Sequence, residues 1–260
     1  MEEVCRLPGS TFSSAEKSVY TLIARGDGVK AKEISRLLGM SRAEVNSILF
    51  SSPLLHDLCY QDSAYRWHAL IRQSALHEGL YEFAGWYGLV SEFIASGEAD
   101  WLADLERGCR RIGRNLNDTR GLIHSFLDCR KVMLSLFSDL GRMMDPSFRS
   151  WELVFELRIR RARFIRIYAD VLVITKQRVF SLEFKMKRKI DPDEILQSAK
   201  YGPYLELIFG SHYDICPALV LTSASDLFDF CPVGDTDAVL PVASGQMLFN
   251  VFNEYLGFLS

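Results

Sequence analysis

The sequence lacks a long hydrophobic run: no uninterrupted apolar stretch in its 260 residues approaches the ~18 residues needed to cross a bilayer. Residues 1–10 carry Glu2 and Glu3 and have no apolar core, so we expect no secretory signal. The six cysteines lie far apart and form no CxxC pair, a pattern typical of reduced thiols. We therefore expect a cytoplasmic protein that has no membrane partner, no disulfide framework and no cysteine-ligated zinc.

Several motifs that mark other enzyme classes are also missing. No GxxxxGK[ST] segment is present, so the chain should not hydrolyse ATP itself, and any helicase or ATPase motor would be a partner protein. No GxSxG sequence indicates a serine hydrolase, and the five histidines show no metal-ligand spacing such as HExxH. The chemistry therefore has to come from other residue types.

Charge is distributed unevenly along the chain, although the net charge is only −3. Residues 146–190 contain 12 Lys or Arg against 4 Asp or Glu, whereas residues 191–260 contain 1 Lys against 10 acidic residues. A basic segment inside an acidic chain is a possible electrostatic footprint for nucleic acid. The alternative is a solvated charged surface that the acidic segment balances.

Residues 11–70 are predicted to form a small helical domain. Ser13 and Glu16 open a first helix, and Ser41 and Glu44 form a capping box that opens a third. Residues 39–41 make a tight turn before that third helix, and residues 61–63 join the arms of a short hairpin. The inward-facing positions are apolar, and they are Val19, Leu22, Ile23, Ile34, Leu37, Leu38, Val45, Ile48 and Leu49.

Three helices, a tight turn and a closing hairpin resemble a winged helix-turn-helix domain. The third helix of such a domain often lies in the major groove of DNA. Here that helix offers Arg42 as its one basic residue, so we expect any DNA contact of this domain to include Arg42. The alternative is a domain that docks another protein or a second copy of the chain.

Residues 71–144 are predicted to be helical, because apolar residues recur there at helical spacing. The stripes include Leu80, Phe83, Tyr87, Phe93, Trp101, Leu105, Phe126, Met133 and Phe137. The basic cluster of this region, Arg107, Arg110, Arg111 and Arg114, is expected to form a solvated helix face rather than to touch phosphates.

The apolar period changes from helical to two in residues 145–260. Between residues 151 and 159 the large apolar side chains occupy every odd position, which predicts a strand. Further strands are expected over residues 164–175, 178–186 and 217–222, and helices from residue 192 to a break at Gly202 and over residues 246–258. The predicted fold class is α/β, or α+β overall, with a mixed sheet flanked by helices.

Three charged residues interrupt the apolar strands of this third region. Glu183 and Lys185 are two apart on one strand and so share a face. Asp170 lies on the preceding strand, which a short turn at residues 176–177 joins to the strand of Glu183. Buried carboxylates at close range repel each other unless a cation or a proton lies between them, and their oxygens suit Mg²⁺ or Mn²⁺. The alternative is a salt bridge of Lys185 with either carboxylate on a solvated sheet face.

The order Asp170, Glu183-x-Lys185, and then Gln197-x-x-x-Tyr201 resembles the PD-(D/E)XK nuclease superfamily, in particular its RecB-like branch. The resemblance covers roughly residues 145–224, including a strand at residues 217–222 where that fold has another core strand. It implies a restriction-endonuclease-like sheet and a metal-dependent nuclease, with a role in restriction, defence or repair.

The resemblance also implies roles for individual residues. Asp170 and Glu183 would bind Mg²⁺, Lys185 would be the catalytic lysine, and Gln197 and Tyr201 would support the site or the DNA backbone. Many members have a further Glu ahead of the Asp; Glu156 and Glu152 are candidates here, on one side of a strand rather than in a first helix, and Glu156 is preferred. Basic residues expected on DNA phosphates are Arg160, Arg163, Lys187, Arg188 and Lys189.

Two other functions stay open at this point. The first is a DNA-binding regulator whose nuclease fold is catalytically inactive. The second is a protein-interaction module in which the winged helix docks a partner. By analogy with the superfamily, the nuclease itself would act as a homodimer or with an ATPase partner.

Overall fold

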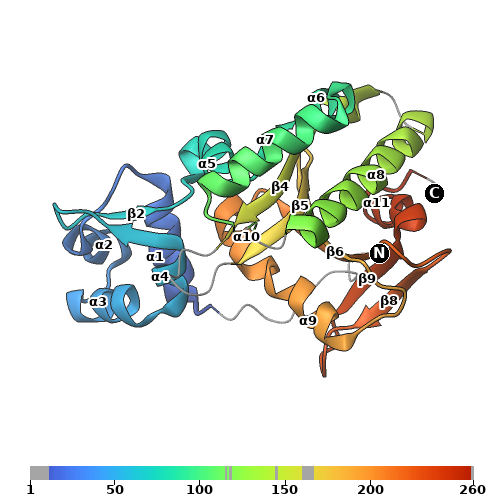
Figure 1. Ribbon diagram of the computed structural model, residues 1–260. Coiled ribbons are helices and arrows are strands. Elements are labelled where there is room, and N and C mark those ends of the chain that lie inside the picture. The colour runs from blue at the N-terminus through green and yellow to red at the C-terminus, as the bar shows by residue number, and fades with distance from the viewer. Residues whose placement is uncertain (1–11, 115, 117–118, 144–145, 160–166, 259–260) are drawn as a thin grey trace.

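A mixed sheet forms the centre of the molecule (Figure 1). The structure is a computed structural model that describes residues 12–114, 116, 119–143, 146–159 and 167–258. Within these residues the sheet has seven strands in the order β3-β4-β5-β6-β7-β9-β8. Helices cover both of its faces, so the predicted fold class, a mixed α/β sheet flanked by helices, is confirmed.

The N-terminal region consists of four helices and a two-stranded hairpin. The helices are α1 (Ser14–Arg25), α2 (Ala31–Leu38), α3 (Arg42–Ser51) and α4 (Pro53–Leu58), and the hairpin pairs β1 (Cys59–Gln61) with β2 (Trp67–Ala69). The capping box predicted at the start of α3 is present, and the N-cap predicted at Ser13 of α1 also forms one with Glu16. The sequence prediction missed α4, which begins with Ser52 as N-cap and Pro53 in its first turn. It was also wrong about Leu37, whose side chain is exposed.

The middle region is not wholly helical, contrary to expectation. After a short 3₁₀ turn (Gln73–Ala75) come α5 (Leu76–Phe83), β3 (Trp86–Leu89), α6 (Val90–Ala95), α7 (Glu98–Arg111) and α8 (Thr119–Met143). Strand β3 pairs antiparallel with β4 and forms one edge of the sheet. Its apolar residues were read as part of a helical stripe, but a long-range partner strand decides its conformation.

The third region supplies the other strands of the sheet. A 3₁₀ turn (Pro146–Ser150) leads into β4 (Glu152–Arg158), β5 (Tyr168–Ile174) and β6 (Arg178–Lys185), which form an antiparallel meander. Helices α9 (Pro192–Lys200) and α10 (Gly202–Phe209) then cross to β7 (Asp214–Leu221), which is parallel to β6. A meander, a crossover helix and a following strand were expected here and are present. The parallel pairing of β7 with β6 is seen only in the structure. Part of the strand expected over residues 164–175 lies outside the described residues.

The sequence prediction missed two strands near the C-terminal end. Strand β9 (Val239–Ser244) lies parallel to β7, and β8 (Phe228–Pro232) pairs antiparallel with β9 at the second edge of the sheet. Both contain a proline, which is unfavourable within a sheet and hid them from pattern reading. A 3₁₀ turn (Gly245–Met247) and α11 (Leu248–Leu256) follow, close to the predicted helix.

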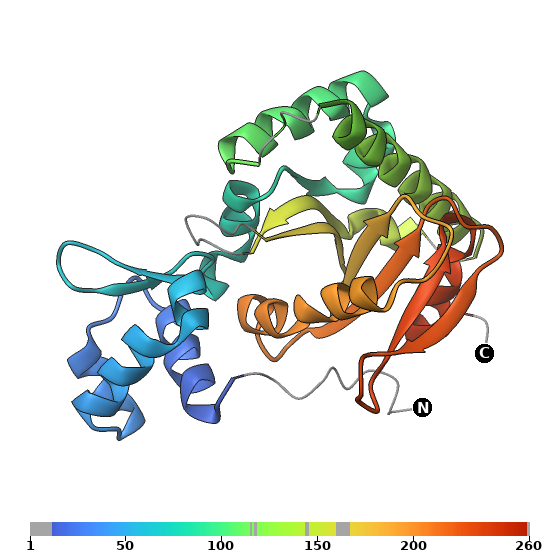
Figure 2. The ribbon, with the colours of Figure 1, turned by 60° about the horizontal axis from the view of Figure 1, so that its bottom comes forward.

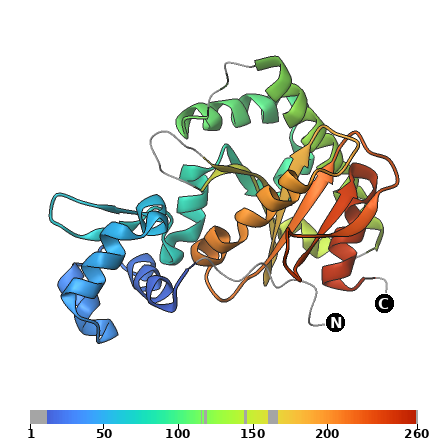
Figure 3. The same ribbon diagram turned by 90° about the horizontal axis from the view of Figure 1, so that it is seen from below.

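The two faces of the sheet have different coverings (Figures 2 and 3). Residues of α6, α7, α8 and α11 share one apolar core with β4, β5 and β6. On the opposite face, α10 and the N-terminal helices share a second core with β4 and β5, and α9 packs over β7 and β9. None of the helices in the described part of the chain has the length and apolar character that crossing a membrane requires.

One residue breaks the regular alternation in β4. Leu153 and Phe155 belong to the core beneath α7 and α8, but Leu157 and Ile159 belong to the opposite core. Between them Glu156 adopts a left-handed backbone conformation with φ 56°, which is unusual for a residue other than glycine. The expected two-residue period therefore ends at Glu156, and the side chains beyond it change face.

Candidate active site

Strands β5 and β6 place two carboxylates beside each other. The antiparallel ladder between these strands ends at the pair Val171 and Leu182, and Asp170 and Glu183 are the next residues on the two strands. Asp170 as a whole residue is half-buried, and its Oδ2 accepts a hydrogen bond from the backbone N–H of Phe184 over 2.9 Å. The expectation that Asp170 and Glu183 lie on adjacent strands is therefore met.

Glu183 is the more buried residue of the pair, with 3% of its surface exposed. Its Oε1 accepts hydrogen bonds from Nζ of Lys185 at 2.8 Å and from Nε2 of Gln197 at 3.0 Å. Burial and the neighbouring charge of Asp170 raise the pKa of Glu183, whereas the Lys185 ammonium opposes that rise. The site thus holds a carboxylate whose charged form needs cations nearby.

Lys185 carries the cation closest to this carboxylate. Burial by itself would lower the pKa of Lys185, but the charge and hydrogen bond of Glu183 outweigh burial, so the pKa is raised. The side chain keeps 23% exposure, so the ammonium group is not sealed off from solvent. Lys185 is therefore placed to donate hydrogen bonds and to offset negative charge at this site.

Gln197 and Tyr201 join the site from the crossover helix. Asp191 caps α9 by accepting a hydrogen bond from the Asp193 N–H, and Gln197 lies on the helix face turned toward β6. Nε2 of Gln197 also lies 3.1 Å from the Tyr201 hydroxyl. Tyr201 is buried, and its pKa is raised by burial and by the charge of Glu183. The structure thus brings together the two motif segments that the sequence resemblance had joined.

Glu156 is a third carboxylate near this pair. It is 3% exposed, and Nε of Arg114 forms an ion pair with its Oε2 at 2.9 Å. Burial and the charge of Asp170 raise the pKa of Glu156, while Arg114 lowers it. The other candidate, Glu152, is engaged elsewhere, where its Oε2 accepts a hydrogen bond from Tyr87. Of these two glutamates, Glu156 is therefore the one whose charge interacts with Asp170 and Glu183.

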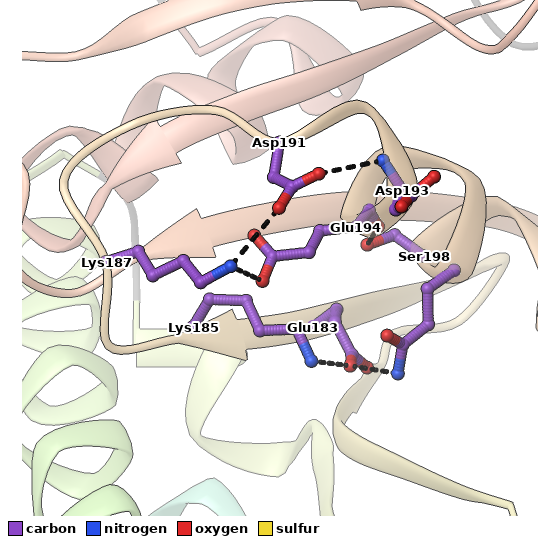
Figure 4. A network of polar contacts seen from close by, with 8 residues as sticks. Glu183, Lys185, Lys187, Asp191, Asp193, Glu194 and Ser198 are labelled. Atoms are coloured by element: carbon purple, nitrogen blue, oxygen red, sulfur yellow. Dashed lines mark hydrogen bonds and ion pairs between the residues drawn. The ribbon is translucent and has the colours of Figure 1, made fainter.

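The basic residues expected on DNA have different surroundings. Nζ of Lys187 lies 2.7 Å from Oε1 of Glu194 and 3.3 Å from Oδ2 of Asp191, so α9 already supplies partners for this cation (Figure 4). Arg188 and Lys189 are exposed in the segment that follows β6.

One further candidate for DNA contact lies away from this group. Arg42 is exposed at the start of α3, in a different part of the molecule from β6 (Figure 1). Arg160 and Arg163 lie outside the described residues.

A divalent cation fits the donors present at this site. Oε2 of Glu183 is buried and accepts no hydrogen bond within the described residues, which leaves one carboxylate oxygen open for a cation. No three acidic, His or Cys side chains in the described part of the chain are grouped so that they could hold a metal ion. Mg²⁺ is usually held by one or two carboxylates, with waters and substrate phosphates as the other ligands, so Asp170 and Glu183 are the side chains that would hold such an ion.

Arg114 is the site residue that sequence reasoning misjudged. It was expected on a solvated face of α7 together with Arg107, Arg110 and Arg111. The helix ends at Arg111, however, and Gly113 has φ 73°, so Arg114 does not continue the helical spacing. A glycine just before the last arginine of the cluster was the signal that could have separated it from the others.

Comparisons with known proteins do not assign the chain to a family. No family model matches it, and no curated protein matches it. Among solved structures, the chain is similar to the crystal structure of protein VC1899 from Vibrio cholerae, with 11% sequence identity and a TM-score of 0.29. The match covers 94% of this chain and 50% of that one, so the chain spans about half the length of VC1899. A likeness this weak carries no functional argument.

Proposed function

We propose that this protein is a metal-dependent nuclease of the PD-(D/E)XK type that hydrolyses DNA phosphodiester bonds. One observation carries the proposal: Glu183, Lys185 and Gln197 form a single hydrogen-bonded unit beside Asp170. One buried oxygen of Glu183 has no hydrogen-bond partner in the described part of the chain. A surface salt bridge would need neither the burial of Glu183 nor the contribution from α9. The arrangement suits a site that is completed by a cation and a phosphate.

Asp170 and Glu183 are the proposed ligands of Mg²⁺ or Mn²⁺. When bound, such an ion would polarise the scissile phosphate and lower the pKa of a bound water. Gln197 fixes the rotation of the Glu183 carboxylate, and Tyr201 in turn holds Gln197. Lys185, as an ammonium group, would donate hydrogen bonds to the phosphate or to the attacking water and offset charge that builds up in the transition state.

The proposed reaction adds water across one P–O bond without a covalent enzyme intermediate. The water oxygen bonds to phosphorus while the bond from phosphorus to one sugar oxygen breaks. One proton of the water ends on the released hydroxyl group, and the other passes to solvent. The products are one strand end with a phosphate monoester and one with a hydroxyl.

The test is cleavage of linear, circular and single-stranded DNA in the presence of Mg²⁺ or Mn²⁺. Wild type is compared with Glu183→Ala and Lys185→Ala, and with Lys176→Ala as a matched control, since Lys176 is an exposed lysine at the turn of the same hairpin. We expect metal-dependent cleavage by wild type and the control, and a loss of about 100-fold or more in the two site variants. The preferred substrate then separates cutting at ends from internal cutting.

A second candidate is a DNA-binding regulator with an inactive nuclease fold. It is favoured by one observation: Lys185 and Arg114 already pair with Glu183 and Glu156, so the buried carboxylates have cations without any metal. DNA binding that persists in EDTA, with no cleavage under Mg²⁺ or Mn²⁺, would replace the nuclease proposal with this one. Failure to retard DNA at low salt would instead favour a protein-docking role for the N-terminal region.

A further inference from the structure

Arg114 occupies a fixed backbone position at the end of α7. The helix closes with hydrogen bonds from the Ile112 N–H to the Gly108 carbonyl at 2.9 Å and from the Arg114 N–H to the Cys109 carbonyl at 2.8 Å. Gly113 takes the left-handed conformation between them, as is common at helix ends. The direction in which Arg114 leaves the helix is therefore set by the main chain.

The Arg114 side chain reaches the group of carboxylates. Its Nε lies 2.9 Å from Oε2 of Glu156, and its guanidinium carbon lies 4.5 Å from the centre of the Tyr168 ring. Glu156 is almost fully enclosed, with 4% side-chain exposure, whereas the Arg114 side chain retains 29%. Nε of Arg114 and Oε2 of Glu156 form an ion pair but no hydrogen bond within the described residues. A guanidinium has five N–H donors, so this partly exposed one has donors left for an anion.

The main chain around this pair is arranged to bring α7 close to β4. A Cβ atom on Gly108 would lie 1.8 Å from the Gly85 carbonyl oxygen, and one on Gly85 would lie 3.0 Å from Cβ of Glu156. The Gly85 N–H donates to the carbonyls of both Phe155 and Glu156, at 2.9 and 3.1 Å, and so holds Glu156 in its left-handed conformation. Strain of this kind is retained where the surroundings enforce it, and it clusters at functional sites.

Arg114 also acts on the other two carboxylates. Its charge lowers the pKa of Asp170 and of Glu183 as well as that of Glu156, against the stronger effect of burial. The three acids and the two cations, Lys185 and Arg114, leave one net negative charge if all are ionised. One divalent cation and one phosphodiester would bring the group to neutrality. This sum of formal charges favours one metal ion, and Arg114 then helps to balance the charge of the substrate phosphate.

We propose that Arg114 is a catalytic residue that binds the substrate phosphate beside Lys185, and that Glu156 positions Arg114 rather than serving as a third metal ligand. The proposal rests on the nuclease function argued above and deepens it. A guanidinium held in this way supplies a fixed cation where charge develops during phosphoryl transfer. The sequence resemblance had implied Glu156 as a metal ligand and had given Arg114 no role.

The first experiment measures Mn²⁺ binding by calorimetry in the absence of DNA. The variants are Arg114→Gln, Glu156→Gln and the double variant, with Arg107→Gln as the control from the solvent-exposed part of α7. Arg114→Gln should tighten Mn²⁺ binding by about tenfold, because one nearby positive charge is removed. The double variant should return to within about threefold of wild type, since it removes a neutral pair. A loss of more than about tenfold in the double variant would make Glu156 a ligand and overturn the proposal.

The second experiment measures DNA binding and DNA cleavage by the same proteins. Arg114→Gln and the double variant should both weaken binding of a DNA oligonucleotide in Mn²⁺ by about tenfold and slow single-turnover cleavage by about 100-fold, although their Mn²⁺ affinities differ. Arg107→Gln should behave as wild type. Arg114→Lys, which keeps the charge but not the planar fork, serves if Arg114→Gln does not fold, and should lose about tenfold in cleavage rate with Mn²⁺ affinity unchanged.

The two proposals fail in different ways. Wild-type DNA binding and cleavage rates in Arg114→Gln would overturn the role of Arg114 and leave the nuclease function intact. A wild type that binds Mn²⁺ and DNA but cuts nothing would overturn the nuclease function, while the affinities of the variants still decide the role of Arg114. A wild type that binds no Mn²⁺ would overturn both.

Discussion

Nε2 of Gln197 lies 3.0 Å from Oε1 of Glu183, to which it donates a hydrogen bond across the boundary between α9 and β6. The same carboxylate oxygen receives the Lys185 ammonium, so both donors act on Oε1 and leave Oε2 open. A carboxylate held at one oxygen has a fixed rotation, and its second oxygen points consistently to one place. This is the preorganisation that binding a cation and a phosphate requires.

The buried charge of Glu183 should make stability depend on pH. Because the folded-state pKa of Glu183 is raised above its ordinary value, the folded protein binds the proton more tightly than the unfolded chain does. The stabilising effect of that proton is fully present below the unfolded pKa and is lost as pH rises through the folded pKa. Glu183→Gln removes this dependence, so its melting temperature relative to wild type should rise between about pH 5 and pH 8.5.

The measurement is thermal unfolding in metal-free buffer with EDTA. Between the two pH values, the free energy of unfolding of Glu183→Gln should rise relative to that of wild type by on the order of 2 kcal/mol, since each pKa unit is worth about 1.4 kcal/mol. Glu254→Gln, at an exposed glutamate of α11, is the control and should follow wild type at both pH values. If the melting temperature of Glu183→Gln instead falls relative to wild type as the pH rises, Glu183 is stabilised as a carboxylate in the folded protein.

Mg²⁺ should stabilise the folded protein, and more at high pH than at low pH. At about pH 8.5 the carboxylates of Asp170 and Glu183 are more fully ionised, and a cation relieves their repulsion. At about 100 times the dissociation constant, binding contributes about 2.7 kcal/mol, which raises the melting temperature by several degrees. Asp170→Asn should abolish the shift. An equal shift with NaCl of matched ionic strength would assign the effect to general screening instead.

The close packing of α7 against the β3–β4 edge makes a prediction about stability. Gly108→Ala would place a methyl group 1.8 Å from the Gly85 carbonyl oxygen, so the helix has to move away, at a cost of about 2–3 kcal/mol. Gly141→Ala in α8 is the matched control, because its Cβ would be 3.6 Å from the nearest atom, a ring carbon of Phe148. This control should be neutral or stabilising by up to about 1 kcal/mol through helix propensity. Denaturant unfolding of both variants tests the difference; equal stabilities would show that α7 does not pack this closely.

Much of the fold followed from local sequence signals. The N-cap at Ser13, the capping box Ser41–Glu44 and the Asp191–Pro192 helix start could be predicted because each signal is complete within four residues. Strand β3 and the β8–β9 pair were missed because their partners are distant in sequence and their own patterns are short or contain proline.

The candidate site could be predicted from the sequence to a similar extent. Asp170, Glu183, Lys185 and Gln197 have short spacings, so period and motif order placed them on neighbouring elements. The approach of Arg114 to Glu156 depends on a helix end, a left-handed glutamate and two glycines from three separate segments. No single stretch of sequence contains that information, because it arises only when α7 packs on the sheet.

Three neighbouring cations follow β6, and they differ in their partners and exposure. Lys187 is paired with Glu194 and Asp191, so removing it exposes two acids and takes away a charge that is already balanced. Arg188 and Lys189 are exposed and can neutralise phosphates. Arg188→Ala and Lys189→Ala should each lower the slope of log affinity for DNA against log salt by about one, whereas Lys187→Ala should leave that slope unchanged. Fluorescence anisotropy with a labelled duplex in EDTA, titrated from about 50 to 200 mM salt, gives the slopes. A fall for Lys187→Ala equal to that for Arg188→Ala would mean that DNA displaces α9 as the partner of Lys187.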